Sequence, residues 1–197
     1  MYSLPKTITT STGQEFAITN NGDYRVVLRC FEALNDSELS EDERVLASLL
    51  IFYNEFQDYD DLTQLDEVAM NELVKSMYSF FDCNQPESIG YNANKKLIDW
   101  DQDEHIIVAA INNVANTEVR SLDYLHWFTF MGYYLSIGES VLSTVVSIRD
   151  KIVSGKKLED YERKFKQSNP QYFNWNSKTA DELAMDEYVR SLWNKED

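Results

Sequence analysis

One run of alternating aspartates comes closest, by residue type and spacing, to a recognised binding chemistry. Asp99, Asp101 and Asp103 alternate as the first ligands of a calcium-binding loop do. Such a loop also needs glycine at its sixth position and a bidentate glutamate at its twelfth, where this chain has Glu104 and Ala110. We therefore expect these carboxylates to lie at a helix N-terminus, which the helix dipole favours, and not to bind a metal.

The two histidines and two cysteines also fail to form a reactive pattern. His105 and His126 are not four residues apart on a helix, and a buried, hydrogen-bonded histidine is the expected state of His126, with pairing to Asp123 as the alternative. Cys30 and Cys83 are expected to be reduced thiols. The chain has no G-x-S-x-G, phosphate-loop, dinucleotide or Cys-x-x-Cys motif. These observations predict a protein that is not an enzyme, with no cofactor and no metal.

The charge of the chain restricts its partners. The chain has 34 acidic and 18 basic residues, which give a formal net charge of −16 on 197 residues. Nucleic acids and membrane surfaces are polyanions that need a basic face, so we expect neither as a partner. With 43% apolar residues the chain has enough material for a core. The first residues carry no apolar leader, and the most apolar stretch, 122–137, is too short for a bilayer, so we expect a soluble protein of the cytoplasm.

The elements that would position any site are mainly α-helical, with a small N-terminal β-hairpin. β-prone residues at 7–10 and 15–19 flank a Ser-Thr-Gly turn. Asp23 and the Ser40–Glu43 capping box predict helix starts, and apolar spacing predicts further helices over 62–81 and 122–137. The expected organisation is 1–82, the hairpin plus three helices; 83–96, a linker or long loop; 97–170, a helical core with an aromatic-rich helix; and 171–197, a C-terminal helical tail.

Six aromatic residues gather within 124–134, and most are expected to pack in the core. The alternative is that some line a groove for an apolar partner helix, for which the candidates are Tyr124, Trp127, Phe128 and Tyr134. Residues 149–166 hold seven basic and four acidic residues in an otherwise acidic chain. Arg149, Lys156 and Lys157 are therefore candidates for self-association with the acidic half of a second copy, alongside the simpler reading of a solvated helix face.

Several segments together resemble a known family. They are the hairpin followed by Asp23-Tyr24-Arg25, the stretch LRCFEALND (28–36), Ile98–Asp103, and above all YLHWFTF (124–130) and STVVSIR (143–149). The string resembles the gene-product-fifteen family of long-tailed siphophages and prophages of Gram-positive bacteria, over most of residues 13–170. The stretch 83–96 and the residues after about 170 show no clear match.

The resemblance implies a tail assembly chaperone acting in the host cell cytoplasm. Members look like products of the genes between the major tail protein and the tape measure protein, so the implied partners are the tape measure protein and, second, the tail-tube protein. The family has no catalytic residues to carry over. A tape measure protein is a long helical chain with apolar faces, and a soluble helical module with an apolar groove suits that partner.

Other functions stay open at this point. A structural tail component would remain in the mature virion, whereas a chaperone would be absent from it. An acidic DNA mimic would block a host nucleic-acid enzyme and would show carboxylates spaced like phosphates on one face. A hydrolase built from scattered residues would show carboxylates converging in a deep pocket.

Overall fold

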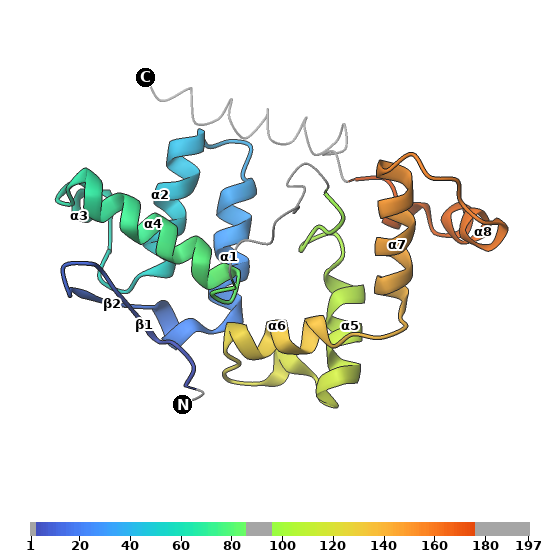
Figure 1. The fold of residues 1–197 in the computed structure, drawn as a ribbon, viewed down its shortest axis with the longest axis horizontal. Helices are drawn as coiled ribbons and strands as arrows, with labels where there is room; N and C mark the ends of the chain where they lie inside the picture. Colours follow the sequence, from blue (N-terminus) through green and yellow to red (C-terminus); the bar gives the residue numbers. More distant parts are fainter. Residues whose placement is uncertain (1–2, 86–95, 176–197) are drawn as a thin grey trace, which may run out of the picture.

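The computed structural model describes residues 3–85 and 96–175 and confirms a mainly helical fold with a two-stranded antiparallel N-terminal hairpin (Figure 1). Most of the predicted C-terminal helical tail, 171–197, lies outside the described residues. In chain order the elements are β1 (Thr7–Thr9), β2 (Glu15–Ala17), η1 (Thr19–Gly22), α1 (Tyr24–Asn35), α2 (Glu41–Phe52), α3 (Tyr59–Thr63), α4 (Glu67–Phe81), α5 (Glu104–Ala115), η2 (Val119–Ser121), α6 (Trp127–Leu135), α7 (Val141–Val153), α8 (Asp160–Ser168) and η3 (Pro170–Tyr172).

The hairpin forms as its sequence predicts, and a short bridge is among the contacts that join it to the helices. Thr7 pairs with Ala17, and an isolated bridge links Ile18 to Tyr53 at the end of α2. Gly22 follows in the left-handed region, at φ +78°, where a side chain would be strained. A Cβ at this position would lie 2.8 Å from Cζ of Phe80, so the glycine also allows the chain to pass close to α4.

Helix caps in the N-terminal half agree with the sequence at two places and correct it at a third. Asp23 caps α1 by accepting the Arg25 amide, and Ser40 and Glu43 form the predicted capping box of α2. The prediction of a single helix over 62–81 is wrong. The chain forms two helices there, α3 and α4, because Asp66 takes up an extended conformation and its carboxylate accepts the amide of Ala69. The segment 1–82 thus contains four α-helices, not three.

The helix predicted over 122–137 is also shorter than expected. It begins only at Trp127, because the residues before it pair with α1. The Tyr24 amide donates to the Leu125 carbonyl, the Leu125 amide donates to Asp23, and Arg25 donates to the Leu122 carbonyl at 2.7 Å. These bonds keep 122–126 out of the helix, and His126 caps the helix that follows.

One buried cluster draws on both halves of the chain, from Phe16 and Val27 on one side to Ile111 and Val145 on the other. Figure 1 shows α6 lying between the helices of the N-terminal half and α5, with α7 and α8 beyond. The division into domains at 83–96 stays a prediction, and most of that stretch lies outside the described residues.

Candidate functional site

A hollow with an apolar floor lies between α1 and α5, and its volume is about 320 Å³. We call it the α1/α5 groove. Its volume is at the lower end of the roughly 300–1,000 Å³ of small-molecule pockets, which suits one or two side chains of a partner. Its floor consists of Tyr24 and Leu28 from α1, Trp100 from the preceding segment, Ile107 and Val108 from α5, and Phe130 from α6.

Charged side chains of both signs border this floor. They are Arg25, Arg29 and Glu32 from α1, Asp101 and Glu104 near the start of α5, and Arg120 from η2. Arg120 is held by Glu118, whose pKa the guanidinium lowers to about 2, and it also contacts Glu104 at 3.4 Å. An apolar floor with a fixed polar border is the usual anatomy of a protein-binding pocket.

The aromatic candidates do not form one surface. Trp127 is 1% exposed, and its indole nitrogen donates to the Phe81 carbonyl at 2.9 Å, so its ring belongs to the core. Tyr134 is half-buried and packs against Trp100, with ring centroids 5.5 Å apart, behind the floor of the groove. A partner contact by Trp127 would require the core to open.

Tyr124 and Phe128 do not line the α1/α5 groove. Phe128 is half-buried against Phe80 and His126. Tyr124 is 43% exposed, and its hydroxyl donates to the Asn21 carbonyl beside a second, more polar hollow. Of the four candidates, Tyr124 has the most accessible ring, and partner binding by the set stays a prediction.

Sequence reasoning missed the groove because its floor comes from four separate segments. The one local signal was in α5, where the adjacent residues Ile107 and Val108 widen the apolar face beyond a single stripe. A wide face predicts packing on more than one side, but it does not identify Tyr24, Leu28 and Trp100 as the neighbours.

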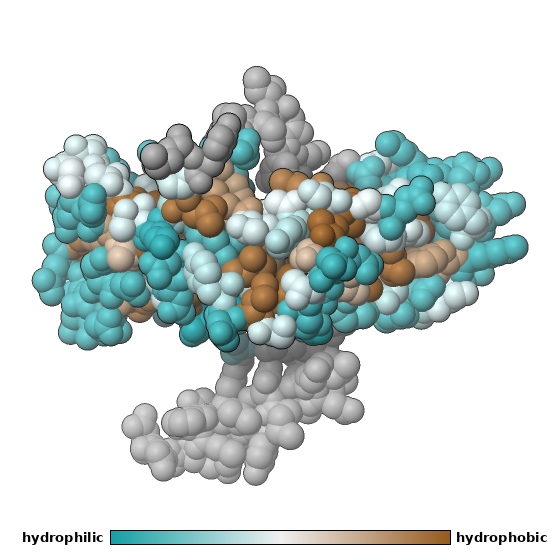
Figure 2. All heavy atoms as spheres, turned by 90° about the horizontal axis from the view of Figure 1, so that it is seen from below, coloured by the Kyte–Doolittle hydropathy of each residue, from teal (hydrophilic) through white to brown (hydrophobic). Residues whose placement is uncertain are grey.

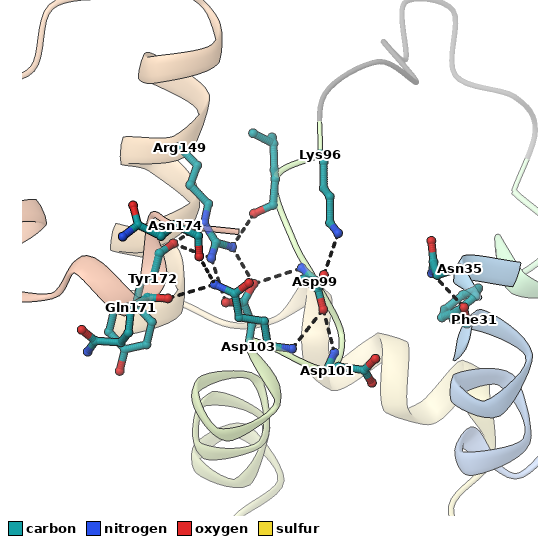
Figure 3. Close-up of polar contacts among 12 residues, drawn as sticks. Phe31, Asn35, Lys96, Asp99, Asp101, Asp103, Arg149, Gln171, Tyr172 and Asn174 are labelled. Carbon is teal, nitrogen blue, oxygen red and sulfur yellow. Dashed lines mark hydrogen bonds and ion pairs between the residues drawn. The ribbon is translucent and has the colours of Figure 1, made fainter. Parts of the chain in front are cut away.

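Arg149, a candidate for self-association, is instead buried inside the molecule (Figure 3). Its side chain is 3% exposed and forms a bidentate ion pair with the fully buried Asp103, in which Nη2 and Oδ1 are 2.9 Å apart. It also donates to the carbonyls of Leu97 and Tyr172. We call these four residues the Arg149 cluster. Asp103 lies at the N-terminus of α5, as expected, but its carboxylate serves this ion pair and makes no hydrogen bond that caps the helix.

The other two self-association candidates are exposed. Lys156 and Lys157 lie between α7 and α8, and Lys156 approaches Asp150 at 4.0 Å. Figure 2 shows mainly hydrophilic side chains toward both ends of the molecule and apolar side chains gathered between them. Self-association through these lysines stays a prediction.

Both histidines are engaged in hydrogen bonds. His105 contacts the Tyr172 hydroxyl at 3.1 Å. His126 is 1% exposed, its Nδ1 accepts the Phe128 amide, and its Nε2 lies 2.9 Å from the Pro5 carbonyl. These contacts require the tautomer with the proton on Nε2. His126 is thus the buried, hydrogen-bonded residue that was expected, and Asp123 is not its partner in the structure.

Acidification is expected to destabilise the protein through His126. Burial lowers its pKa below the usual 6.5, so the unfolded chain binds the proton more readily than the folded one. The contribution is fully present above pH 6.5 and is lost as the pH falls toward the lower folded value. Protonation would also place a second N–H against the Phe128 amide. Urea unfolding between pH 7.5 and 5.5 should show a loss of stability that His126→Gln reduces, and equal slopes for the two proteins would contradict this role.

Both cysteines lie in surroundings that disfavour the thiolate. Burial raises the pKa of Cys30 to about 12 and that of Cys83 to about 11, so both thiols stay protonated at neutral pH. Within residues 3–85 and 96–175, no three histidine, cysteine or carboxylate side chains lie close enough to share a metal ion. No helix in the same ranges has the length and apolar character to cross a membrane.

Comparison with known proteins assigns the chain to a family. A search of curated proteins and a search of solved structures each returned no match. The model of one protein family, described as Bacteriophage Gp15 protein, matches residues 4–173. The match covers the hairpin, the groove and the Arg149 cluster, which is nearly all of the described structure. The chain therefore belongs to the bacteriophage Gp15 family.

Proposed function

We propose that this phage protein is a non-enzymatic tail assembly chaperone that binds the tape measure protein in the host cytoplasm and recruits tail-tube subunits. The observation that carries the proposal is the α1/α5 groove, whose apolar floor lies between two helices and whose border bears three arginines and three carboxylates. An amphipathic helix would bury its apolar side chains on the floor and pair its charges with the border.

The same groove explains how a chaperone of this kind would stay soluble. The enclosed space is small, so each copy exposes little apolar surface when it is empty. The net charge of −16 keeps unbound copies apart. Many copies would be needed to cover a long tape measure protein, and each would shield a short helical length.

A matched pair of substitutions on α1 tests the groove. Leu28 and Leu34 are both half-buried, but only Leu28 lines the groove. We expect Leu28→Ser to reduce the tape measure protein that co-purifies after co-expression by about tenfold, the effect of losing one central contact. Leu34→Ser should change the yield by less than about twofold. Recovered tape measure and chaperone are quantified on the same gel, and soluble yield of each variant is checked alone.

Three outcomes would contradict the proposal. First, if the tape measure protein stays insoluble and does not co-purify when it is co-expressed with the wild-type chain, the chaperone function is rejected. Equal losses for Leu28→Ser and Leu34→Ser reject the groove as the binding site. Finally, detection of the protein by mass spectrometry in purified virions identifies a retained structural component.

Several acidic residues of the stretches 36–43 and 58–67, which a DNA mimic would use, cap helices instead. The Asp58 and Asp66 side chains accept the amides of Asp61 and Ala69, and Glu43 accepts the Ser40 amide. These carboxylates therefore cap three different helices, a use that accounts for their positions without a DNA-binding partner.

A further inference from the structure

One end of the molecule is formed by α8 and the last turn of α7, and we call it the basic end (Figure 1). Residues 150–166 hold six basic and four acidic residues, a balance of +2 in a chain whose net charge is −16. Three of the basic side chains are used in ion pairs with nearby acids, which are Glu162, Asp160 and Asp150. The other three are exposed and make no ion pair with any described residue: Lys157, Lys164 and Lys166.

Apolar side chains lie exposed at the basic end as well. Tyr161 on α8 is 65% exposed, and Val153 at the end of α7 is 48% exposed. Nζ of Lys151 lies 2.6 Å from a carboxylate oxygen of Glu162, a contact that holds the end of α7 beside α8. Exposed apolar side chains with positive charge to spare fit an acidic protein surface that carries apolar side chains of its own.

The opposite end of the molecule has this complementary character (Figure 1). It is formed by α3 and the first turn of α4, and we call it the acidic end. Residues 45–74 hold seven acidic residues and no basic one, and none of the seven is ion-paired with a described residue. Two apolar side chains are exposed among these acids, Tyr59 next to Asp60 and Val68 next to Glu67.

The net charge of −16 does not prevent contact between the two kinds of end. At physiological ionic strength the Debye length is about 8 Å. The molecule is longer than this, since α1 alone, with 12 residues, is about 18 Å long. Repulsion between whole molecules is therefore largely screened, whereas unlike charges in direct contact still attract. Contact between two acidic surfaces would bring like charges together, so pairing of unlike ends is favoured.

We infer that the basic end of one copy binds the acidic end of a second copy, head to tail. The two surfaces differ, so the contact is heterologous and every assembly keeps one free end of each kind, which lets it grow as an open row. The contact needs only this chain, whereas a row along the tape measure protein rests on the function proposed above. Copies held on one tape measure protein are at a high effective concentration, which strengthens a contact that is weak between free copies.

Two full-length variants, each with one disabled end, test the contact by sedimentation velocity. Tyr59→Ser/Val68→Ser removes the exposed apolar side chains of the acidic end, and Val153→Ser/Tyr161→Ser removes those of the basic end. The wild-type chain should sediment faster as its concentration rises, and each variant alone should associate at least about tenfold more weakly. An equimolar mixture of the two variants should form a dimer that grows no further, because each variant retains one working end.

A control variant and a change of salt complete the test. Leu135 is the most exposed large apolar side chain of α6, at neither end, and Leu135→Ser should associate as the wild type does. Raising the salt to about 1 M, where the Debye length is about 3 Å, should weaken the association of the wild-type chain. Circular dichroism checks that each variant is folded.

Each other result overturns the inference. A wild-type chain that stays monomeric at the highest concentration has no such contact. Association kept by one of the two variants alone means a symmetric contact between like ends, and an equal loss in Leu135→Ser means a different surface. Association that does not weaken in high salt means that the charges of the two ends do not contribute.

The contact and the proposed function fail in different ways. If the wild-type chain associates as expected but the tape measure protein is not recovered, the function is rejected and the contact stands. If a monomeric wild-type chain still recovers the tape measure protein, the contact is rejected and the function stands. Lower recovery by Val153→Ser/Tyr161→Ser in that case would identify the tape measure protein as the occupant of the basic end.

Discussion

Replacing Arg149 by methionine is expected to lower the free energy of unfolding by about 3–5 kcal/mol. The substitution keeps much of the apolar stem but removes the charge that balances Asp103, which has no exposed surface. It also removes the donors that satisfy the carbonyls of Leu97 and Tyr172. Urea unfolding followed by circular dichroism measures the loss.

Two controls separate burial from charge. Arg163 and Asp160 form an exposed pair on α8, with side chains 47% and 86% accessible, so Arg163→Met should cost less than about 1 kcal/mol. The double variant Arg149→Met/Asp103→Leu should recover only part of the loss, because it leaves no uncompensated buried charge but does not restore the donors to the carbonyls of Leu97 and Tyr172. A loss for Arg149→Met no greater than that for Arg163→Met would show that Asp103 is not buried against Arg149.

Substituting alanine for Trp127 is the second change with a large expected effect, about 3–5 kcal/mol of unfolding free energy. The indole is almost wholly buried and contacts Phe31, Trp100 and Phe130. Alanine would leave a cavity among these rings and remove the donor to the Phe81 carbonyl. Thermal and urea unfolding give the magnitude.

The same variant tests whether Trp127 is a partner contact. At a temperature where Trp127→Ala is still folded, tape measure recovery should equal that of wild type. Leu135, 75% exposed on the same helix, provides the control, and Leu135→Ala should change stability by less than about 0.5 kcal/mol. A stability change for Trp127→Ala as small as this, together with lost recovery, would place the indole on the binding surface.

Local features of the fold could be predicted because neighbouring residues determine them. The Ser40 capping box, the Asp23 cap and the hairpin turn depend on residues within four positions of one another. The start of α6 could not be found in this way. The apolar pattern of 122–137 favours a helix, but Asp23 and Arg25 bind the backbone of 122–125 from about 100 residues away.

In the candidate site, too, features set by neighbouring residues could be predicted from the sequence and features set by distant residues could not. The aromatic run of 124–134 indicated a core helix, and Trp127 and Phe130 are indeed buried. Position in sequence did not reveal that Phe130 would form a floor with Tyr24 and Trp100, since that requires the tertiary fold. Arg149 was misjudged for a related reason. Its basic neighbours indicated a solvated face, and only the packing of α7 on α5 turns its side chain toward Asp103.

The bonds between Asp23 and Leu125 have a consequence for synthesis of the chain. The two residues are 102 positions apart, so at about 5–20 residues per second a ribosome needs roughly 5–20 s to add the second after the first. During that interval the nascent N-terminal half has no α6 to cover Tyr24 and Phe31. A slower ribosome would lengthen the exposure, and faster elongation through this stretch would favour a soluble product.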